Sequence, residues 1–179
     1  MFRISLSIRK AVITVATGAL AAGMLALGAG AAHADSGLEY QIFPVSNPFL
    51  YLNVSGGSKG DGAKIIQYVV SGDNDLWYFR AVNGHTEIVN KLSNKCMTTD
   101  GVEGHQLYQW YCEGTPGQLW DIGFTSGIGG PSLVPGTIKN PASNLVADIA
   151  GGSITSGAAV IGYHYTGGTN QLFNALNNS

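Results

Sequence analysis

Short stretches rich in β-branched and aromatic residues recur along the chain, and turn-forming residues bound each of them. Three such stretches, 64–70, 106–111 and 158–165, are dominated by Ile, Leu, Val, Tyr and Trp. This pattern is typical of strands joined by tight turns. Beyond the N-terminal segment, apolar residues do not recur at the spacing of an amphipathic helix. The pattern therefore predicts an all-β protein.

The pattern repeats three times, at intervals of about 45 residues. A Leu followed by an aromatic residue ends each copy, in NDLW (74–77), GQLW (117–120) and NQLF (170–173). The beginnings are also alike, with an Ile followed by a Ser-Asn pair, in YQIFPVSN (40–47), TEIVNKLSN (86–94) and GTIKNPASN (136–144). The copies span roughly 40–82, 83–124 and 136–179.

Three similar all-β units predict a closed assembly with pseudo-threefold symmetry, because no single unit can bury its apolar face alone. A β-trefoil, a three-bladed propeller and an open solenoid all satisfy this periodicity.

The first 34 residues have the composition of an export signal. Arg3, Arg9 and Lys10 precede an apolar run over 11–31, and the triplet Ala32-His33-Ala34 follows it. This layout predicts a secretory signal peptide over 1–34, cleaved after Ala34, and hence a secreted protein. A membrane anchor that stays attached is the alternative interpretation. No later segment is apolar enough to span a bilayer, so no membrane insertion is expected after cleavage.

Residues 35–179 are enough for one domain with one core. They carry six Lys and Arg against eleven Asp and Glu, a formal charge of −5. An acidic chain without a basic cluster argues against nucleic acid as a partner. Cys96 and Cys112 are expected to form a disulfide, which is the default for two cysteines in an exported protein.

The three endings in register, the repeat frame and the cysteine pair resemble the ricin B-chain lectin family, the QxW-repeat β-trefoils. The resemblance covers roughly 40–176 and is closest over 160–173, where Phe173 replaces the family's Trp. The first copy departs more, with Asp75 where the family has Gln. The resemblance implies a β-trefoil and a lectin domain over 35–179, with the aromatics that end the copies, Trp77, Trp120 and Phe173, in its core.

The resemblance also implies one shallow saccharide pocket in each copy. The family builds it from an acidic residue early in the repeat, an aromatic on a later strand and an Asn before the Gln-x-Trp. The third copy matches all three positions, with Asp148, Tyr163 and Asn170. These groups suit a pyranose, because a carboxylate and a carboxamide bind its hydroxyls while a ring stacks on its C–H face. Ile161 stands where the family often has Gln, and Gln171 is expected to brace backbone.

The other two copies match the set less well. The first supplies Asn53, Tyr68 and Asn74, and Asn53 cannot form the charge-assisted hydrogen bond of a carboxylate. The second has Thr98, Trp110 and Gly117 at these positions, and its first two are 12 residues apart rather than 15. We therefore expect the second copy to be structural.

These features favour a non-enzymatic lectin without a cofactor or metal ion. Its expected partners are glycans, either galactose-type sugars or plant polysaccharides, bound mainly by the third copy. A β-trefoil that binds protein independently of sugar, such as a hydrolase inhibitor or the targeting subunit of a toxin, is the alternative. An enzyme is disfavoured, because glycoside cleavage needs two carboxyl groups at one bond and the third copy offers only Asp148. The histidines, His85, His105 and His164, do not form a zinc-binding pattern.

Overall fold

The computed structural model describes residues 37–124 and 134–178, so the predicted signal peptide lies outside the described residues. Within this part of the chain, the regular elements are β-strands and three-residue 3-10 helices. The all-β prediction is therefore confirmed. A search of the same residues finds no helix that is long and apolar enough to cross a membrane.

Each copy contributes four described strands. The first contains β1 (Tyr40–Pro44), β2 (Tyr51–Val54), η1 (Ser55–Gly57), β3 (Ile65–Tyr68), η2 (Asp73–Asp75) and β4 (Leu76–Val82). The second contains β5 (His85–Asn90), β6 (Cys96–Thr98), β7 (Tyr108–Trp110), η3 (Pro116–Gln118) and β8 (Asp121–Ile122). The third contains β9 (Ile138–Lys139), β10 (Val146–Ile149), η4 (Ala150–Gly152), β11 (Val160–Tyr163), η5 (Thr169–Gln171) and β12 (Phe173–Asn177).

Six of these strands form a closed barrel. β1 pairs antiparallel with both β12 and β4, β4 pairs with β5, and β8 pairs with β9. Two isolated bridges complete the ring, Thr86 with Trp120 between the β5 and β8 segments and Gly136 with Phe173 between the β9 and β12 segments. Because the ring closes, the described barrel has no free sheet edge.

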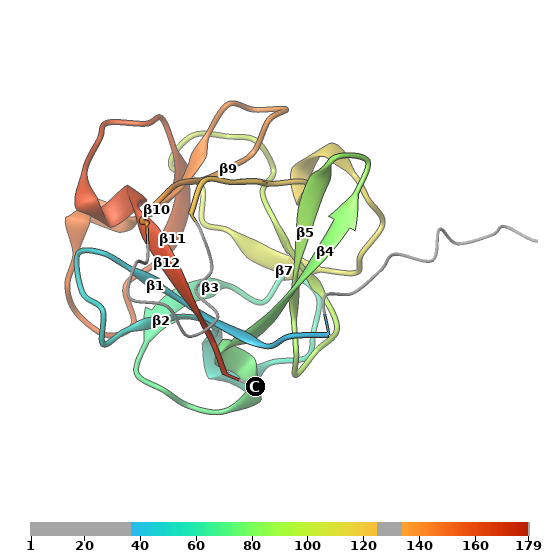
Figure 1. The fold of residues 1–179 in the computed structure, drawn as a ribbon, viewed down its shortest axis with the longest axis horizontal. Coiled ribbons are helices and arrows are strands. Elements are labelled where there is room, and N and C mark those ends of the chain that lie inside the picture. The colour runs from blue at the N-terminus through green and yellow to red at the C-terminus, as the bar shows by residue number, and fades with distance from the viewer. Residues whose placement is uncertain (1–36, 125–133, 179) are drawn as a thin grey trace, which may run out of the picture. The chain divides into compact units, whose positions relative to one another are not determined.

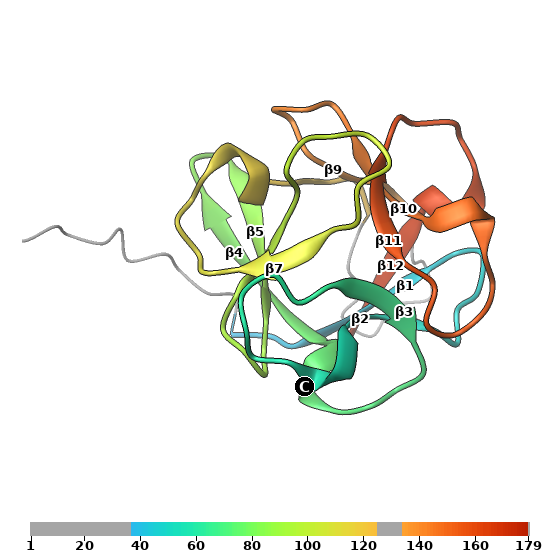
Figure 2. The same ribbon diagram turned by 180° about the vertical axis from the view of Figure 1, so that it is seen from behind.

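The other six strands form three hairpins, β2–β3, β6–β7 and β10–β11. Single bridges join them pairwise, Lys64 with Tyr108, Ile66 with Ala159 and Gln106 with Ile161. Figure 1 shows the hairpin strands of the three copies in separate parts of the ribbon, and from behind Figure 2 shows β3, β7 and β11 as neighbours. A six-stranded barrel with three mutually bridged hairpins is a β-trefoil, which decides among the three architectures that the periodicity allowed.

The three hairpins share one register, so residues aligned in sequence are also equivalent in space. The first pair in each hairpin joins Tyr51 with Tyr68, Cys96 with Trp110 and Val146 with Tyr163. The predicted sugar acceptors lie two residues further along, in the pairs Asn53 with Ile66, Thr98 with Tyr108 and Asp148 with Ile161.

The aromatics that end the copies lie in the core, as predicted. Trp77, Trp120 and Phe173 are at most 1% exposed. The indole Nε1 of Trp77 donates to the Leu52 carbonyl at 2.9 Å, and that of Trp120 donates to the Met97 carbonyl at 3.0 Å. Each indole thereby ties the end of its copy to the first strand of its own hairpin.

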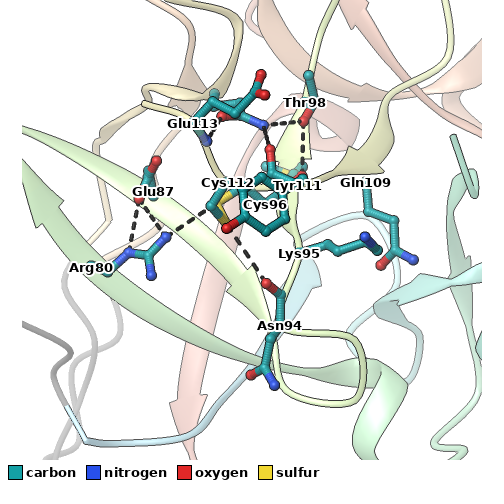
Figure 3. Close-up of a disulfide and its surroundings, with 12 residues drawn as sticks. Arg80, Glu87, Asn94, Lys95, Cys96, Thr98, Gln109, Tyr111, Cys112 and Glu113 are labelled. Carbon is teal, nitrogen blue, oxygen red and sulfur yellow. Dashed lines mark hydrogen bonds and ion pairs between the residues drawn. A yellow bond between two sulfur atoms is a disulfide. The ribbon is translucent and has the colours of Figure 1, made fainter. Parts of the chain in front are cut away.

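Cys96 and Cys112 form the predicted disulfide, shown in Figure 3. Beside it, the buried carboxylate of Glu87 forms an ion pair of 2.7 Å with Arg80, whose Nη2 also donates to Cys96 Sγ at 3.5 Å. The disulfide and the ion pair therefore lie in contact beside β5 in the second copy.

Candidate functional site

The three residues predicted for the third copy meet around one pocket of about 340 Å³. Asp148 comes from β10, Tyr163 from the end of β11 and Asn170 from η5. Gly151 and Gly152 also line this pocket, and both have a φ of 63°, a conformation that glycine adopts without strain. A Cβ on either glycine would meet nothing within 4 Å, so the entrance is open on this side.

The carboxylate of Asp148 is held from behind by amides. Its Oδ2 accepts a hydrogen bond of 2.7 Å from Gln171 Nε2, and the Asn170 side chain also donates to it. Asp148 is only 5% exposed, and this burial raises the pKa of its carboxyl above the ordinary value of 3.8. The two amide hydrogen bonds and the charge of His164 lower the same pKa, but burial outweighs them.

Gln171 does more than the sequence predicted. It braces backbone as expected, because its Nε2 donates to the His164 carbonyl at 2.8 Å and its Oε1 accepts from the Thr166 N–H at 2.7 Å. Its hydrogen bond to Asp148 was missed. Gln118 in the second copy has the same three kinds of contact, to the Tyr111 carbonyl, the Glu113 N–H and Thr98 Oγ1.

Tyr163 and Ile161 form the aromatic and apolar part of the third pocket, and Asn170 and Thr166 add polar groups. The Tyr163 ring is partly exposed, and its centroid lies 4.4 Å from that of His164. Ile161, opposite Asp148 in the hairpin, also lines the pocket. Asn170 Nδ2 donates to the Ile149 carbonyl at 3.2 Å, which fixes the amide at the rim.

The predicted residues of the first copy also meet, around a pocket of about 420 Å³. Asn74 Nδ2 donates to Asn53 Oδ1 at 2.9 Å, Asn53 Nδ2 donates to Ser71 Oγ at 2.6 Å, and Ser71 Oγ donates to Asn74 Oδ1 at 3.1 Å. Tyr68, 41% exposed, stands beside this closed ring of hydrogen bonds. The amides of the first pocket therefore satisfy one another, and its described lining carries no charged residue.

Asp75 occupies the place that Gln171 has in the third copy. Its Oδ2 accepts from the Ser71 N–H at 2.6 Å, and its Oδ1 accepts from Gln41 Nε2 at 3.2 Å. The first copy thus has an amide at the position of Asp148 and a buried carboxylate at the position of Gln171. The third copy has the reverse arrangement.

The second copy does not assemble the same site. Thr98 is buried, and its Oγ1 donates to the Cys96 carbonyl at 2.8 Å. The Gly117 carbonyl accepts from the Thr99 N–H at 2.9 Å, and a Cβ on Gly117 would lie 2.3 Å from the Thr99 carbonyl oxygen. Backbone therefore occupies the place of an Asn side chain. Trp110 is 42% exposed, while Gly117 lines a different pocket of about 320 Å³ with Thr99, Asp100 and residues of 140–143.

Each described histidine contacts a carboxylate through Nδ1. His85 pairs with Asp121 and His105 with Asp100, both at 2.7 Å, and His164 pairs with Glu103. Among the described residues, the one cluster with metal-ligand atoms close together is Glu87, Cys96 and Cys112, and both of its sulfur atoms are in the disulfide.

Comparisons with known proteins agree with the observed fold. The sequence profile described as "Ricin-type beta-trefoil lectin domain-like" matches residues 73–163. A search of curated proteins finds no significant match.

Similar solved structures include a designed threefold-symmetric protein, ThreeFoil, at 27% identity and a TM-score of 0.66, covering 76% of this chain and 96% of that one. The C-terminal half of an earthworm R-type lectin, solved with GalNAc, is 20% identical with a TM-score of 0.62, over 79% of this chain and 99% of that one. An exo-β-1,3-galactanase from Clostridium thermocellum is 25% identical with a TM-score of 0.68, over 79% of this chain and 30% of that one. These similarities agree with the β-trefoil topology.

Proposed function

Since the chain belongs to the family of ricin-type β-trefoil lectin-like domains, we propose that it is a carbohydrate-binding protein whose main site is the pocket of the third copy. The family and the fold support carbohydrate binding in general. For the sugar we propose a galactose-type unit, alone or within a plant polysaccharide. The earthworm lectin half solved with GalNAc supports this choice by analogy, because GalNAc is itself a galactose-type sugar.

The observation that carries the proposal is the meeting of Asp148, Tyr163 and Asn170 around one opening. They come from three separate segments and supply a charged acceptor, a flat ring and a carboxamide. A pyranose needs these three groups, because its hydroxyl rim requires acceptors and donors while its C–H face requires an aromatic surface. The hydrogen bond from Gln171 holds the carboxylate before the sugar arrives, so little ordering remains to be done on binding.

The affinity of one such pocket for a monosaccharide is expected to be low. A shallow site with a single charged acceptor corresponds to a dissociation constant on the order of millimolar, or about −4 kcal/mol. Clustered glycans would raise the apparent affinity, because a second pocket on the same protein binds at a high effective concentration. The first copy is the candidate for this weaker second site, since Asn53, Tyr68 and Asn74 line one pocket.

The equivalent aromatics of the three copies provide a matched test. Tyr163→Ala, Tyr68→Ala and Trp110→Ala each remove a ring that ends its hairpin strand. We expect Tyr163→Ala to abolish retention on immobilised galactose, lactose or xylan, Tyr68→Ala to weaken it, and Trp110→Ala to leave it unchanged. Asp148→Ala should behave like Tyr163→Ala.

Equal retention of the parent and Asp148→Ala would show that the assigned site is wrong. Retention on a protein partner that free galactose does not compete would favour the alternative of a protein-binding trefoil. A glycan array probed with the parent protein then identifies the preferred sugar.

We propose binding without hydrolysis. Asp148 is the one carboxylate among the described residues that line the third pocket, whereas glycoside cleavage uses two carboxyl groups flanking the bond. Incubation with a panel of polysaccharides should release no reducing ends. Release that depends on Asp148 would overturn this part of the proposal.

We also propose that the protein is secreted after removal of residues 1–34. The disulfide supports this, because such bonds persist in oxidising compartments outside the cytoplasm. Mass spectrometry of the protein from culture medium should give a chain that begins at Asp35. A chain that stays in the cell with its first residues intact would contradict it.

A further inference from the structure

The third copy has a second pocket, of about 470 Å³, beside the segment that follows β11. It is lined by Thr137, Lys139, Asn144, Val146, His164 and Tyr165. None of these residues lines the third-copy sugar pocket. The two pockets are nevertheless adjacent along the chain, because Tyr163 and Thr166 line the sugar pocket while His164 and Tyr165, between them, line the second.

The equivalent place in the second copy is filled by side chains. By register, Val146 corresponds to Cys96 and Thr137 to Glu87, while Tyr165 aligns with Cys112. Figure 3 shows the second-copy arrangement, in which the disulfide, the Glu87 carboxylate and the Arg80 guanidinium lie together. Cys112 Sγ lies 3.8 Å from the Asn94 carbonyl oxygen, which closes the side next to the loop.

The third copy has neither the ion pair nor the disulfide, because Thr137 replaces Glu87 while Val146 and Tyr165 replace the two cysteines. Arg80 lies opposite Glu87 on β4, and the corresponding neighbour of Thr137 is Gly123, whose N–H donates to the Thr137 carbonyl at 2.8 Å. The turn before the hairpin has a similar conformation in the two copies at one position, since Asn94 and Asn144 both have a positive φ, 55° and 64°. By register, the 470 Å³ opening therefore lies at the position that an ion pair and a disulfide occupy in the second copy.

The charge of this opening is opposite to that of the sugar pocket. Lys139 on β9 is half-buried, and its ammonium has no carboxylate within ion-pair distance among the described residues. Its cross-strand neighbour Asp121 pairs with His85 instead. Asn144 and Thr137 add an amide and a hydroxyl, and Tyr165, 55% exposed, adds a ring at the rim.

We propose that this second pocket binds an anionic sugar unit, carrying a carboxylate or a sulfate, that is linked to the neutral sugar in the third-copy pocket. The ammonium of Lys139 neutralises the anion, the amide and hydroxyl bind its oxygen atoms, and the Tyr165 ring packs on the pyranose. His164 pairs through Nδ1 with Glu103, so its other ring nitrogen stays available to the ligand. This inference rests on the proposed function for its neutral unit, while the site for the acidic unit is built from different residues.

The test compares neutral oligosaccharides with partners that differ by one hexuronate or one sulfate ester, by calorimetric titration of the mature disulfide-bonded protein. We expect the acidic partners to bind about three- to tenfold more tightly at low salt, the range of one partly exposed ion pair with hydrogen bonds. Lys139→Gln should remove this preference and leave neutral binding unchanged. Lys59→Gln is the matched control, because it removes the same charge from an exposed loop of the first copy.

The two proposals fail in different ways. If neutral sugars bind through Asp148 and the acidic partners bind no better, or Lys139→Gln keeps the preference, the second pocket is not a sugar subsite. If neutral binding is absent but acidic glycans bind in a Lys139-dependent manner, the proposal for the second pocket is supported and the proposal for the main site is wrong.

Tyr165→Ala, at an exposed position, serves as a second variant should Lys139→Gln unfold, and should lower acidic binding alone. Comparing the hexuronate and sulfate series identifies which anion is preferred.

Discussion

Gln171 Nε2 donates a hydrogen bond of 2.7 Å to Asp148 Oδ2, so the glutamine of the repeat ending holds the carboxylate of the proposed sugar site. Both side chains are buried, at 0% and 5% exposure. A buried carboxylate needs such donors, because burial without them favours its neutral form. The repeat ending and the sugar acceptor therefore act together, although 23 residues separate them.

Replacing Gln171 should damage both stability and binding. Gln171→Leu leaves the Asp148 carboxylate without its donor at 2.7 Å and the Thr166 N–H without its acceptor. We expect a loss of about 1–3 kcal/mol in the free energy of unfolding, together with weaker galactose binding. Gln118→Leu is the matched control, because it makes the same backbone contacts beside Thr98 in the copy without a sugar site. Denaturant unfolding should give similar losses for the two variants, and a binding defect in Gln118→Leu would contradict this account.

Sugar binding at the third copy should weaken in acid. Burial raises the pKa of Asp148 above 3.8, so the carboxyl takes up a proton at a higher pH in the folded chain than in the unfolded one. Protonation removes the charged acceptor, and affinity should fall as the pH is lowered through this raised pKa. The same shift favours folding most at a pH below 3.8, and this contribution is lost as the pH rises through the raised pKa.

Asp148→Asn is the control for this pH dependence. This variant should bind lactose more weakly at neutral pH. Its affinity should not change as the pH passes between the ordinary and the raised pKa of Asp148. Titration of the parent and the variant with lactose across this range checks the prediction. An equal change of affinity with pH in the two proteins would mean that another group controls the pH dependence of binding.

The first copy has its buried carboxylate at Asp75, the position of Gln171, and an amide at the position of Asp148. This exchange predicts that the stability effects of two substitutions there are not additive. Asn53→Asp alone would place a second carboxylate next to the buried Asp75, at the position where the third copy has an Asp–Gln pair. We expect it to destabilise the fold by about 1–3 kcal/mol, because two like charges are then buried close together. Asn53→Asp with Asp75→Gln should recover stability and strengthen sugar binding at the first pocket. A double-mutant cycle measures this coupling, and simple addition of the two single effects would disprove it.

The repeat frame made much of this structure predictable. Register follows from periodicity, so aligning Asp148 with Asn53 and Thr98 in sequence also aligned them across their hairpins. The second copy was expected to be structural from Thr98, Gly117 and its shorter spacing, but the contact of Gly117 with the Thr99 backbone depends on tertiary packing. The second pocket of the third copy was not predicted. It arises where Gly123, Thr137 and Val146, far apart in sequence, replace larger or cross-linked side chains, and no local pattern marks such a space.

Breaking the disulfide should lower stability without closing the sugar pockets. Cys96 and Cys112 are 16 residues apart, and closing a loop of this length is worth about 3 kcal/mol in the chain-entropy account. Reduction should lower the Tm by on the order of 10 °C for a domain of this size. Cys96→Ala with Cys112→Ala should unfold at the same low temperature with or without reductant. Calorimetric scans with galactose present separate this effect from binding, since the proposed pockets contain neither cysteine.

The indole hydrogen bonds are consistent with Trp at the end of two copies. They predict how much stability is lost when either Trp is replaced by Phe, the residue that ends the third copy. Trp120→Phe removes the Nε1 donor to the Met97 carbonyl and leaves a small void at a fully packed position. The lost bond contributes about 1 kcal/mol and the void a similar amount, so unfolding free energy should fall by about 2 kcal/mol. Trp77→Phe should cost about the same, because its Nε1 donates to the Leu52 carbonyl in the equivalent place. Denaturant unfolding of both variants checks this, and a neutral result for either would mean that its carbonyl finds another donor. Galactose binding should persist in both, since these residues lie in the core and the proposed third-copy site belongs to the strand pair β10–β11 and to η5.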